Sequence, residues 1–322
     1  MENRTFAEYP GTTNLTLPTL CEKLFEAQKR RWPAFADACR DLNSLHTREI
    51  ICGSYKVKVQ FNPSREISSS ARIDAESIKK RPCFLCAKNL PNGQQGILYR
   101  KDYLILCNPA PIFDQHFTIV SLRHQPQEIS SSLTSLLQIA ADLSPAHTVF
   151  YNGPACGASA PDHLHFQMIP LSALPYLQTL KTAFLVKEVS SVRFYKKDNL
   201  DRCVVILESK NQEVLREQFE QFSKVLQETV PTSNEPLVNI FCIYENDIWR
   251  LVIFLRQKHR PDAYFASGDK RVFVSPGAID MAGVMITPLL DDFNRLDCET
   301  IRGIYREVSL PAEMMNIMLN QI

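Results

Sequence analysis

The stretch Asp162-His163-Leu164-His165-Phe166-Gln167-Met168-Ile169-Pro170 decides the fold of this chain. Apolar and polar residues alternate along it, and a period of two residues is typical of a β-strand with one buried face. His163, His165 and Gln167 therefore share the other face, where next-but-one residues lie about 6–7 Å apart. At that spacing, two imidazoles and an amide can contact one phosphate or share its contacts with a metal ion.

The loop before this strand runs from Tyr151 to Ser159 and is rich in glycine, alanine and serine. Small residues let backbone amides approach an anionic ligand closely. A flexible anion-binding loop followed by a strand with two histidines predicts phosphate chemistry.

These residues resemble a known family. Asn152-Gly153, Gly157 and the strand from His163 to Pro170 are similar to the core of the histidine-triad superfamily, in which an Asn-Gly…Gly loop leads into His-x-His-x-His. Gln167 replaces the third histidine. That replacement resembles the transferase branch, which includes galactose-1-phosphate uridylyltransferases, dinucleoside tetraphosphate phosphorylases and, nearest in wording, GDP-hexose phosphorylases.

The resemblance implies a fold as well as an activity. We expect an α+β protein with a histidine-triad-like antiparallel sheet, flanked by helices and duplicated with a degenerate second copy. We place the catalytic half at residues 1–178, with N-terminal helices and a zinc knuckle, and the second half at 179–322. Residues 275–288 echo residues 108–121 without a histidine, which favours a repeated unit. The resemblance is good over residues 50 to 175 and poor elsewhere.

For the chemistry, the resemblance implies that His165 attacks a nucleotide phosphorus and that Gln167 donates to the oxygens of the intermediate. A backbone carbonyl of the preceding loop would orient the His165 ring. A neutral amide suits attack by an incoming phosphate, whereas a protonated histidine suits release to water. The predicted function is a nucleotidyltransferase or phosphorylase that acts on a nucleoside diphosphate sugar or dinucleoside polyphosphate through a nucleotidyl-histidine. The alternatives are a histidine-triad hydrolase and a non-catalytic nucleotide-binding protein.

Several residues are candidates for contacts with the nucleotide. Asn152 resembles the family asparagine that contacts ribose or phosphate, and the amides of the small-residue loop would stabilise negative charge. His116 lies in a predicted strand over residues 113–122 and in the superfamily often lines the nucleotide pocket; a buried core histidine is the alternative. The loop and strand candidates are Asn152, Gly153, Gly157, Ser159 and His116.

Two basic segments are further candidates for phosphate binding. Arg65 and Arg72 lie in a serine-rich loop, and a guanidinium matches two phosphate oxygens at once. Lys258, His259 and Arg260 follow an apolar strand, where a cluster of cationic or titratable groups would hold a second phosphate or the acceptor anion. In both segments, solvated surface residues are the alternative.

Cys83 and Cys86 form a Cys-x-x-Cys pair, which on its own is a weak metal signature. In zinc-bearing members of the superfamily, such a pair joins a histidine after the upstream strand and the first histidine of the triad. Transferred to this sequence, the ligands are Cys83, Cys86, His124 and His163. Four nitrogen and sulfur ligands predict a closed structural Zn²⁺ site. The alternative is a reduced cysteine pair with two hydrogen-bonded histidines.

Composition sets limits on the partners. The chain has 322 residues, and its 36 basic and 35 acidic residues give a net charge of +1, which argues against nucleic acid or a membrane surface as a partner. The sequence shows neither a signal-peptide pattern nor an apolar run long enough for a membrane span, so a cytoplasmic protein with reduced cysteines is expected. The expected partners are a nucleotide-containing small molecule and phosphate or a sugar phosphate. The sequence leaves a homodimer open.

Overall fold

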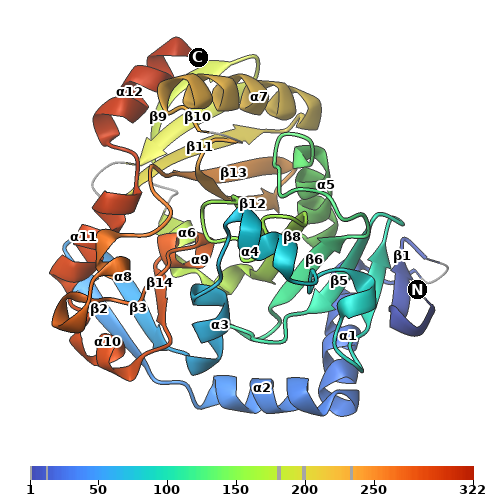
Figure 1. The fold of residues 1–322 in the computed structure, drawn as a ribbon. Coiled ribbons are helices and arrows are strands. Elements are labelled where there is room, and N and C mark those ends of the chain that lie inside the picture. Colours follow the sequence, from blue (N-terminus) through green and yellow to red (C-terminus); the bar gives the residue numbers. More distant parts are fainter. Residues whose placement is uncertain (1, 12–13, 180–182, 198–200, 233–234) are drawn as a thin grey trace.

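A large mixed β-sheet forms the centre of the molecule (Figure 1). The computed structural model describes residues 2–11, 14–179, 183–197, 201–232 and 235–322. Within these ranges the strand order is β1-β4-β5-β6-β8-β7-β12-β13-β11-β10-β9. β1 is parallel to β4, and the other neighbouring strands are antiparallel. The strands are β1 (Thr5–Tyr9), β4 (Gly96–Tyr99), β5 (Tyr103–Cys107), β6 (Phe117–Ser121), β7 (His147–Asn152), β8 (His165–Pro170), β9 (Phe184–Val189), β10 (Val192–Lys197), β11 (Cys203–Ser209), β12 (Val238–Glu245) and β13 (Ile248–Leu255).

The strand order repeats on the two sides of the β7–β12 pair. Outward from this pair, the first side reads β7, β8, β6, β5, β4 and the second reads β12, β13, β11, β10, β9. When the five strands of each side are numbered in chain order, both sides read fourth, fifth, third, second and first, outward from the β7–β12 pair. A helix precedes the fourth strand in both, namely α5 (Leu133–Leu143) and α7 (Gln212–Thr229). The topology agrees with a duplicated fold, whereas the boundary between residues 178 and 179 stays a prediction.

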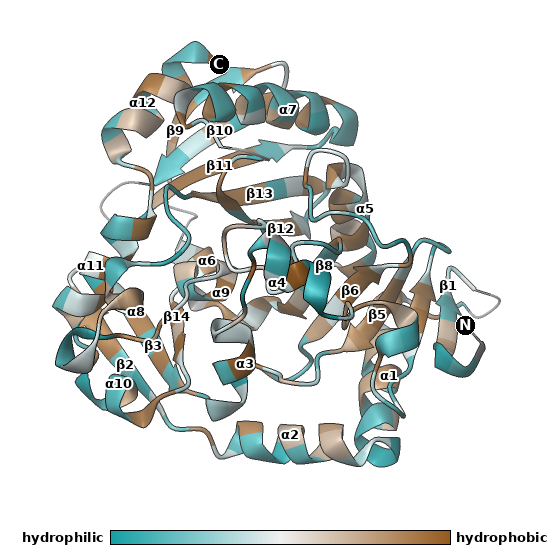
Figure 2. Cartoon of the chain, in the orientation of Figure 1, coloured by the Kyte–Doolittle hydropathy of each residue, from teal (hydrophilic) through white to brown (hydrophobic). Residues whose placement is uncertain are grey.

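Four helices cover one face of the large sheet. α1 (Leu17–Arg31) and α12 (Ala312–Gln321) join α5 and α7 there, and their apolar residues form one hydrophobic core with the strands. Leu164, Phe166 and Met168 point into this core, so the predicted alternation of the strand is confirmed. In Figure 2 the central strands are mainly brown, while the outer surface of α7 is largely teal.

A second, smaller sheet packs on the opposite face of the large sheet, with its own hydrophobic core. It contains β2 (Thr47–Cys52), β3 (Tyr55–Phe61) and β14 (Val284–Thr287), in the order β14-β3-β2. The hairpin of β2 and β3 turns at Gly53, whose positive φ of 64° is readily adopted by glycine. The helices on this side are α6 (Pro175–Thr179), α8 (Asp262–Phe265), α9 (Ala278–Met281), α10 (Leu290–Arg295) and α11 (Cys298–Val308).

The predicted equivalence of residues 275–288 with residues 108–121 is wrong. β14 lies in the small sheet, where it is parallel to β3. By strand order, the counterpart of β6 in the second half is β11. A proline- and glycine-containing loop followed by apolar residues occurs before many strands, so this pattern did not identify the repeated unit.

The remaining helices, α2, α3 and α4, lie in the segments of the chain just before and just after β2 and β3. α2 (Pro33–Asn43) leads from α1 to the small sheet, and α3 (Glu66–Ser69) and α4 (Ala75–Lys80) follow β3. In Figure 1, α4 is drawn near β8 and β12, and α3 is drawn below it, toward α2. Among the described residues, no helix is both long and apolar enough to cross a membrane.

Arg256 ties the end of β13 to several loops. Its side chain is fully buried, and its guanidinium donates to the side chain of Asn239 at 2.7 Å and to the carbonyl of Pro276 at 3.0 Å. Further bonds reach the carbonyls of Lys258, His259 and Val308. A buried cation is stable only when its hydrogen bonds are satisfied, so this residue has a structural function.

We predict that Arg256→Met lowers the free energy of unfolding by more than about 3 kcal/mol, because several buried acceptors lose their donor. Lys258→Met is the matched control: Lys258 is a neighbouring cation that pairs with the acidic side chains of Asp262 and Glu307 nearer the surface. Its loss is expected to cost less than about 1 kcal/mol. Urea denaturation measures both, and equal losses would contradict this assignment.

Candidate active site

A cavity of about 710 Å³ lies on the sheet face that carries His165 and Gln167. Its walls come from the first half, from the α3–α4 segment and from the loop before α9. The residues that line it include Arg65, Arg72, Arg81, Phe84, Leu85, Asn89, Leu90, Gln94, Leu106, Asn152, Gly157, Ala158, Ser159, His165, Gln167, His259, Arg260, Ser275, Gly277 and Asp280.

His165 lies at the start of β8 with its ring held in one orientation. Its Nδ1 lies 2.8 Å from the backbone carbonyl of His163. A carbonyl only accepts, so Nδ1 carries the proton and the lone pair is on Nε2. A backbone carbonyl was predicted as the partner of the ring, but it belongs to His163 and not to the loop from Tyr151 to Ser159. Burial lowers the pKa of His165 to about 4, which keeps the imidazole neutral near pH 7.

Gln167 is oriented by the histidine behind it. The backbone N–H of Ile112 lies 3.2 Å from Nδ1 of His116, so Nδ1 accepts and Nε2 carries the proton. That Nε2 lies 2.8 Å from Oε1 of Gln167. The amide oxygen of Gln167 is therefore occupied, and its NH₂ group remains as a donor for the cavity.

His116 differs from its predicted position on the pocket wall. It is fully buried behind Gln167 and is absent from the cavity lining. Burial and, to a smaller extent, the nearby charge of Arg65 lower the pKa of His116 to about 3. A neutral ring with both nitrogens hydrogen-bonded orients its neighbour and does not reach a ligand.

The small-residue loop presents backbone donors to the cavity. Gly157, Ala158 and Ser159 line it, and none of their N–H groups donates a hydrogen bond to another described residue. Gly157 has a positive φ of 98°, and a Cβ there would lie 2.6 Å from the Cα of Gly277. Gly153 is not on the wall; a Cβ there would lie 2.8 Å from the Val238 carbonyl. Glycine at these two positions allows close backbone packing.

Asn152 lines the cavity and has its oxygen fixed by the second half of the chain. Its Oδ1 accepts from Asn239 at 2.9 Å and from the backbone N–H of Ala278 at 2.8 Å. Its NH₂ group is the polar end that remains for a ligand. Gln127 joins the two central strands by donating to the carbonyls of Asn152 and His165 and accepting from the His165 N–H. Asn239 and Gln127 belong to no sequence motif, and we did not predict them.

The two predicted arginines of the α3 region both line the cavity. Arg65 donates to the carbonyl of Ala110 at 3.0 Å, which leaves guanidinium nitrogens for a ligand. Arg72 is exposed and makes no hydrogen bond with the other described residues. Asp280 lies on the same wall, where burial raises the pKa of its carboxyl group to about 6. No sequence motif includes Asp280, because its position depends on contacts of the α9 loop.

The three residues of the basic turn after β13, Lys258, His259 and Arg260, lie in three different environments. Lys258 lies outside the cavity, where its ammonium group pairs with Asp262 and Glu307. Arg260 lines the cavity, but it donates to Ser275 and to the carbonyls of Ser69 and Ala71. His259 also lines it, and burial lowers its pKa to about 3, so that its ring is neutral. Spacing alone suggested one cationic cluster because it does not show which charges are already paired.

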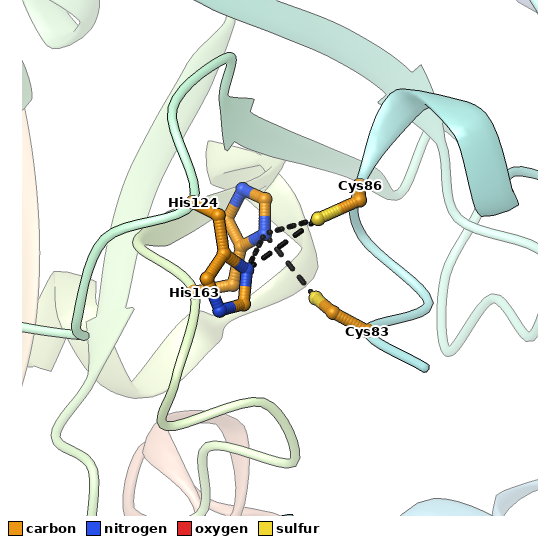
Figure 3. A group of neighbouring side chains, drawn as sticks. All are labelled: Cys83, Cys86, His124 and His163. Atoms are coloured by element: carbon orange, nitrogen blue, oxygen red, sulfur yellow. Dashed lines mark hydrogen bonds between the residues drawn. The ribbon is translucent and has the colours of Figure 1, made fainter. Parts of the chain in front are cut away.

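Cys83, Cys86, His124 and His163 converge on one point (Figure 3). Sγ of Cys83 lies 3.2 Å from Nδ1 of His163, and Sγ of Cys86 lies 3.4 Å from Nδ1 of His124. The two Nδ1 atoms are 3.3 Å apart. These separations are close to the edges of about 3.3–3.8 Å of a tetrahedron with metal–ligand bonds of about 2.0–2.3 Å.

The surroundings of this cluster also suit a metal ion. Nε2 of His163 lies 2.8 Å from the carbonyl of Ser121, so it carries the proton and Nδ1 is free to bind a metal. Nε2 of His124 lies 3.8 Å from a carboxylate oxygen of Asp162, and Arg81 contacts the same carboxylate at 3.1 Å. The four predicted ligands therefore form a cluster fit for a tetrahedral metal ion.

Comparisons with known proteins agree with this fold. A profile of a family described as "Domain of unknown function (DUF4922)" matches residues 24–170. No curated protein sequence matches the chain. The crystal structure of yeast Ap4A phosphorylase Apa2 in complex with AMP is similar, with a TM-score of 0.57 at 15% identity, over 92% of this chain and 98% of that chain.

Two further structures of the yeast enzyme give the same result. The structure described without a ligand has a TM-score of 0.57 at 15% identity, over 92% of this chain and 96% of that chain. The complex with Ap4A has a TM-score of 0.54 at 14% identity, over 87% of this chain and 97% of that chain. The predicted α+β fold, with its large antiparallel sheet flanked by helices, is confirmed: this chain has the fold of an Ap4A phosphorylase.

Proposed function

We propose that this protein is a nucleotidyltransferase of the phosphorylase type, which acts through a covalent nucleotide on His165. The observation that carries the proposal is the His165 ring, which is neutral, fixed by the His163 carbonyl at 2.8 Å and placed with Nε2 at the cavity. The fold adds support, because the similar yeast enzyme has been solved with AMP and with Ap4A. Its substrate would be a nucleoside diphosphate sugar or a dinucleoside polyphosphate.

In the first step, the Nε2 lone pair of His165 attacks the α-phosphorus and forms a P–N bond. The bond from that phosphorus to the bridging oxygen breaks, and the leaving sugar phosphate or nucleotide takes the electron pair. In the second step, an oxygen of inorganic phosphate or of a sugar phosphate attacks the same phosphorus. The P–N bond breaks, a nucleotide product leaves, and the lone pair returns to His165.

The remaining polar groups stabilise charge on the transferring phosphoryl group. The NH₂ of Gln167 and the amides of Gly157 to Ser159 would donate to its non-bridging oxygens. Asn152 would offer its NH₂ to ribose or phosphate. Arg65 and Arg72 would bind the outer phosphates through their guanidinium groups. Each of these contacts uses a donor that has no partner among the described residues.

We also propose that the four-residue cluster binds a structural Zn²⁺. Two thiolates and two imidazoles are ligands that zinc prefers, and four protein ligands leave no position for substrate. Bound there, the ion would fix the Cys83–Cys86 loop to the end of β6 and to His163. The proposed division of the chain near residue 178, with a degenerate second half, rests on the repeated strand order.

The covalent intermediate is directly testable. When wild-type protein is incubated without phosphate with GDP-, UDP- and ADP-sugars and with dinucleoside polyphosphates, intact mass measurement is expected to detect one bound mononucleotide for at least one donor. His165→Ala should form none, because it lacks the attacking nitrogen. His46→Ala is the control, since His46 is outside the cavity lining.

Other outcomes would point to the alternative functions. Steady phosphate-independent hydrolysis without an adduct would make the protein a hydrolase. Binding of a nucleotide with no turnover under any condition would make it a non-catalytic binding protein. Either result would reject the transferase.

His116 should act only through Gln167. We expect His116→Leu to slow adduct formation by about tenfold or more, up to the roughly 10²–10³-fold loss seen when a transition-state donor is removed. KM should change little. In a Gln167→Leu background the same substitution should have almost no further effect, because the amide that it orients is gone. Independent, multiplying effects in single-turnover kinetics would contradict this arrangement.

The metal proposal is tested by elemental analysis. We expect one zinc per chain in wild-type protein and much less in Cys83→Ser and Cys86→Ser, with a lower Tm in both variants. Cys298→Ser serves as the control, because Cys298 lies at the start of α11, outside the cluster. Fully folded wild-type protein that contains no zinc and gains no stability from added zinc would refute the proposal.

A further inference from the structure

One wall of the cavity is a segment that belongs to neither sheet. This segment, the strap, covers residues 66–80 and contains α3 and α4. Ile67, Ser69 and Arg72 of the strap line the cavity, while His165 lines it from β8 of the large sheet. The cavity therefore lies between the strap and the sheet, so the position of the strap affects access to His165.

The strap makes little apolar contact with the rest of the protein. None of its described side chains is buried, and Ile67 is 84% exposed. No described residue of the strap belongs to a hydrophobic cluster. Segments that bury few apolar groups open at low cost. Movement of the strap would therefore leave the hydrophobic cores intact.

Both ends of the strap are fixed by arginines that lie just outside it. Arg65 donates to the carbonyl of Ala110 at 3.0 Å. Arg81 donates to the carbonyl of Ser159 and to the carboxylate of Asp162, both at 3.1 Å. A segment that is held firmly at its ends and loosely in its middle can swing about those ends, as the lids of active sites do.

The middle of the strap is held by two residues from the second half of the chain. Nη2 of Arg260 donates to the carbonyls of Ser69 and Ala71, both at 3.0 Å. The hydroxyl group of Tyr264 donates to the same Ser69 carbonyl at 3.1 Å. Every other hydrogen bond made by the described residues of the strap stays within residues 63–81. Arg260 and Tyr264 therefore form a latch of three hydrogen bonds.

The two residues of the latch are themselves fixed to the body of the protein. The guanidinium carbon of Arg260 lies 4.3 Å from the centroid of the Tyr264 ring, and its Nε donates to Ser275 at 2.9 Å. The Tyr264 ring stacks on Phe273 with 5.0 Å between ring centroids. The latch stays in place when the strap moves, and water can replace its bonds to the strap carbonyls.

We infer that the strap is a gate for the cavity, which opens when the latch releases Ser69 and Ala71 and closes over a bound ligand. The inference rests on the proposed function only for what enters the cavity. In the closed state the strap would shield a nucleotide on His165 from water. The strap also carries Arg72, so a ligand phosphate bound by this guanidinium would favour the closed state.

Labelling of His165 with diethyl pyrocarbonate measures the opening without any nucleotide. The Nε2 lone pair of a neutral imidazole attacks a carbonyl carbon of the reagent, an N–C bond forms and ethyl carbonate leaves. His46 is exposed and reports the unhindered reaction. His116 is fully buried and outside the cavity lining, so it reports unfolding of the core. Peptide mass mapping of the whole protein gives all three rates in one sample.

The latch variants should label faster at His165 alone. Tyr264→Phe removes one of three hydrogen bonds, so we expect His165 to react about two- to tenfold faster. Arg260→Leu removes two charge-assisted bonds, and the rate should rise at least about tenfold. Tyr244→Phe is the matched control and should leave the rate unchanged, because its hydroxyl group contacts Asp247 at 3.2 Å in the β12–β13 hairpin.

Unchanged labelling of His165 in both latch variants would reject the gate. A parallel rise at His116 in both variants would also reject it, because the core would then be opening; if only Arg260→Leu shows this rise, Tyr264→Phe decides. Trypsin cleavage after Arg72 is a second measurement, and its rate should rise by the same factor as the labelling of His165. Faster cleavage with unchanged labelling would mean that the strap moves without controlling the cavity, and would reject the gate as well.

This inference and the proposed function fail separately. A mononucleotide adduct on His165, with unchanged labelling in the latch variants, would keep the transferase and remove the gate. Faster labelling in the latch variants of a protein that forms no adduct with any donor would keep the gate and remove the transferase.

Discussion

The hydrogen bond from Nδ1 of His165 to the backbone carbonyl of His163 is the constraint on which the site depends. It fixes the tautomer and directs Nε2 to the cavity. The side chain of His163 belongs to the cysteine–histidine cluster, so the residue that orients the reactive ring is itself held from the other side. His163 therefore contributes its side chain to the candidate metal cluster and its carbonyl to the orientation of the His165 ring.

The second half of the chain contributes contacts that hold the candidate site in place. Asn239 joins Asn152 to Arg256, and the backbone of Gly277 approaches Gly157 so closely that a side chain would not fit between them. These contacts cross the β7–β12 junction and fix the loop amides of the first half. The duplicated sheet therefore gives the cavity walls from both halves of one chain.

Much of the fold and of the cysteine–histidine cluster was predictable from the sequence. Alternation in His163 to Met168 gave the correct buried face, and the family pattern gathered Cys83 and Cys86 with two histidines that the structure brings together. Local sequence sufficed for the strand because a strand has a period of two, whereas His124 and His163 were identified through the resemblance to the family. Local sequence did not predict the positions of Lys258 and His116. Lys258 pairs with Asp262 and Glu307, and His116 is buried behind Gln167. Both outcomes depend on the tertiary structure.

The central claim is that Nε2 of His165 attacks phosphorus, and the nitrogen that carries the nucleotide tests it most directly. Protein treated with a nucleotide donor in the absence of an acceptor can be examined by ³¹P and ¹⁵N NMR after labelling of its histidines. We predict a phosphoramidate on Nε2 of His165, with the Nδ1 proton still hydrogen-bonded to the His163 carbonyl. A nucleotide attached to Nδ1, or to any other residue, would contradict the account.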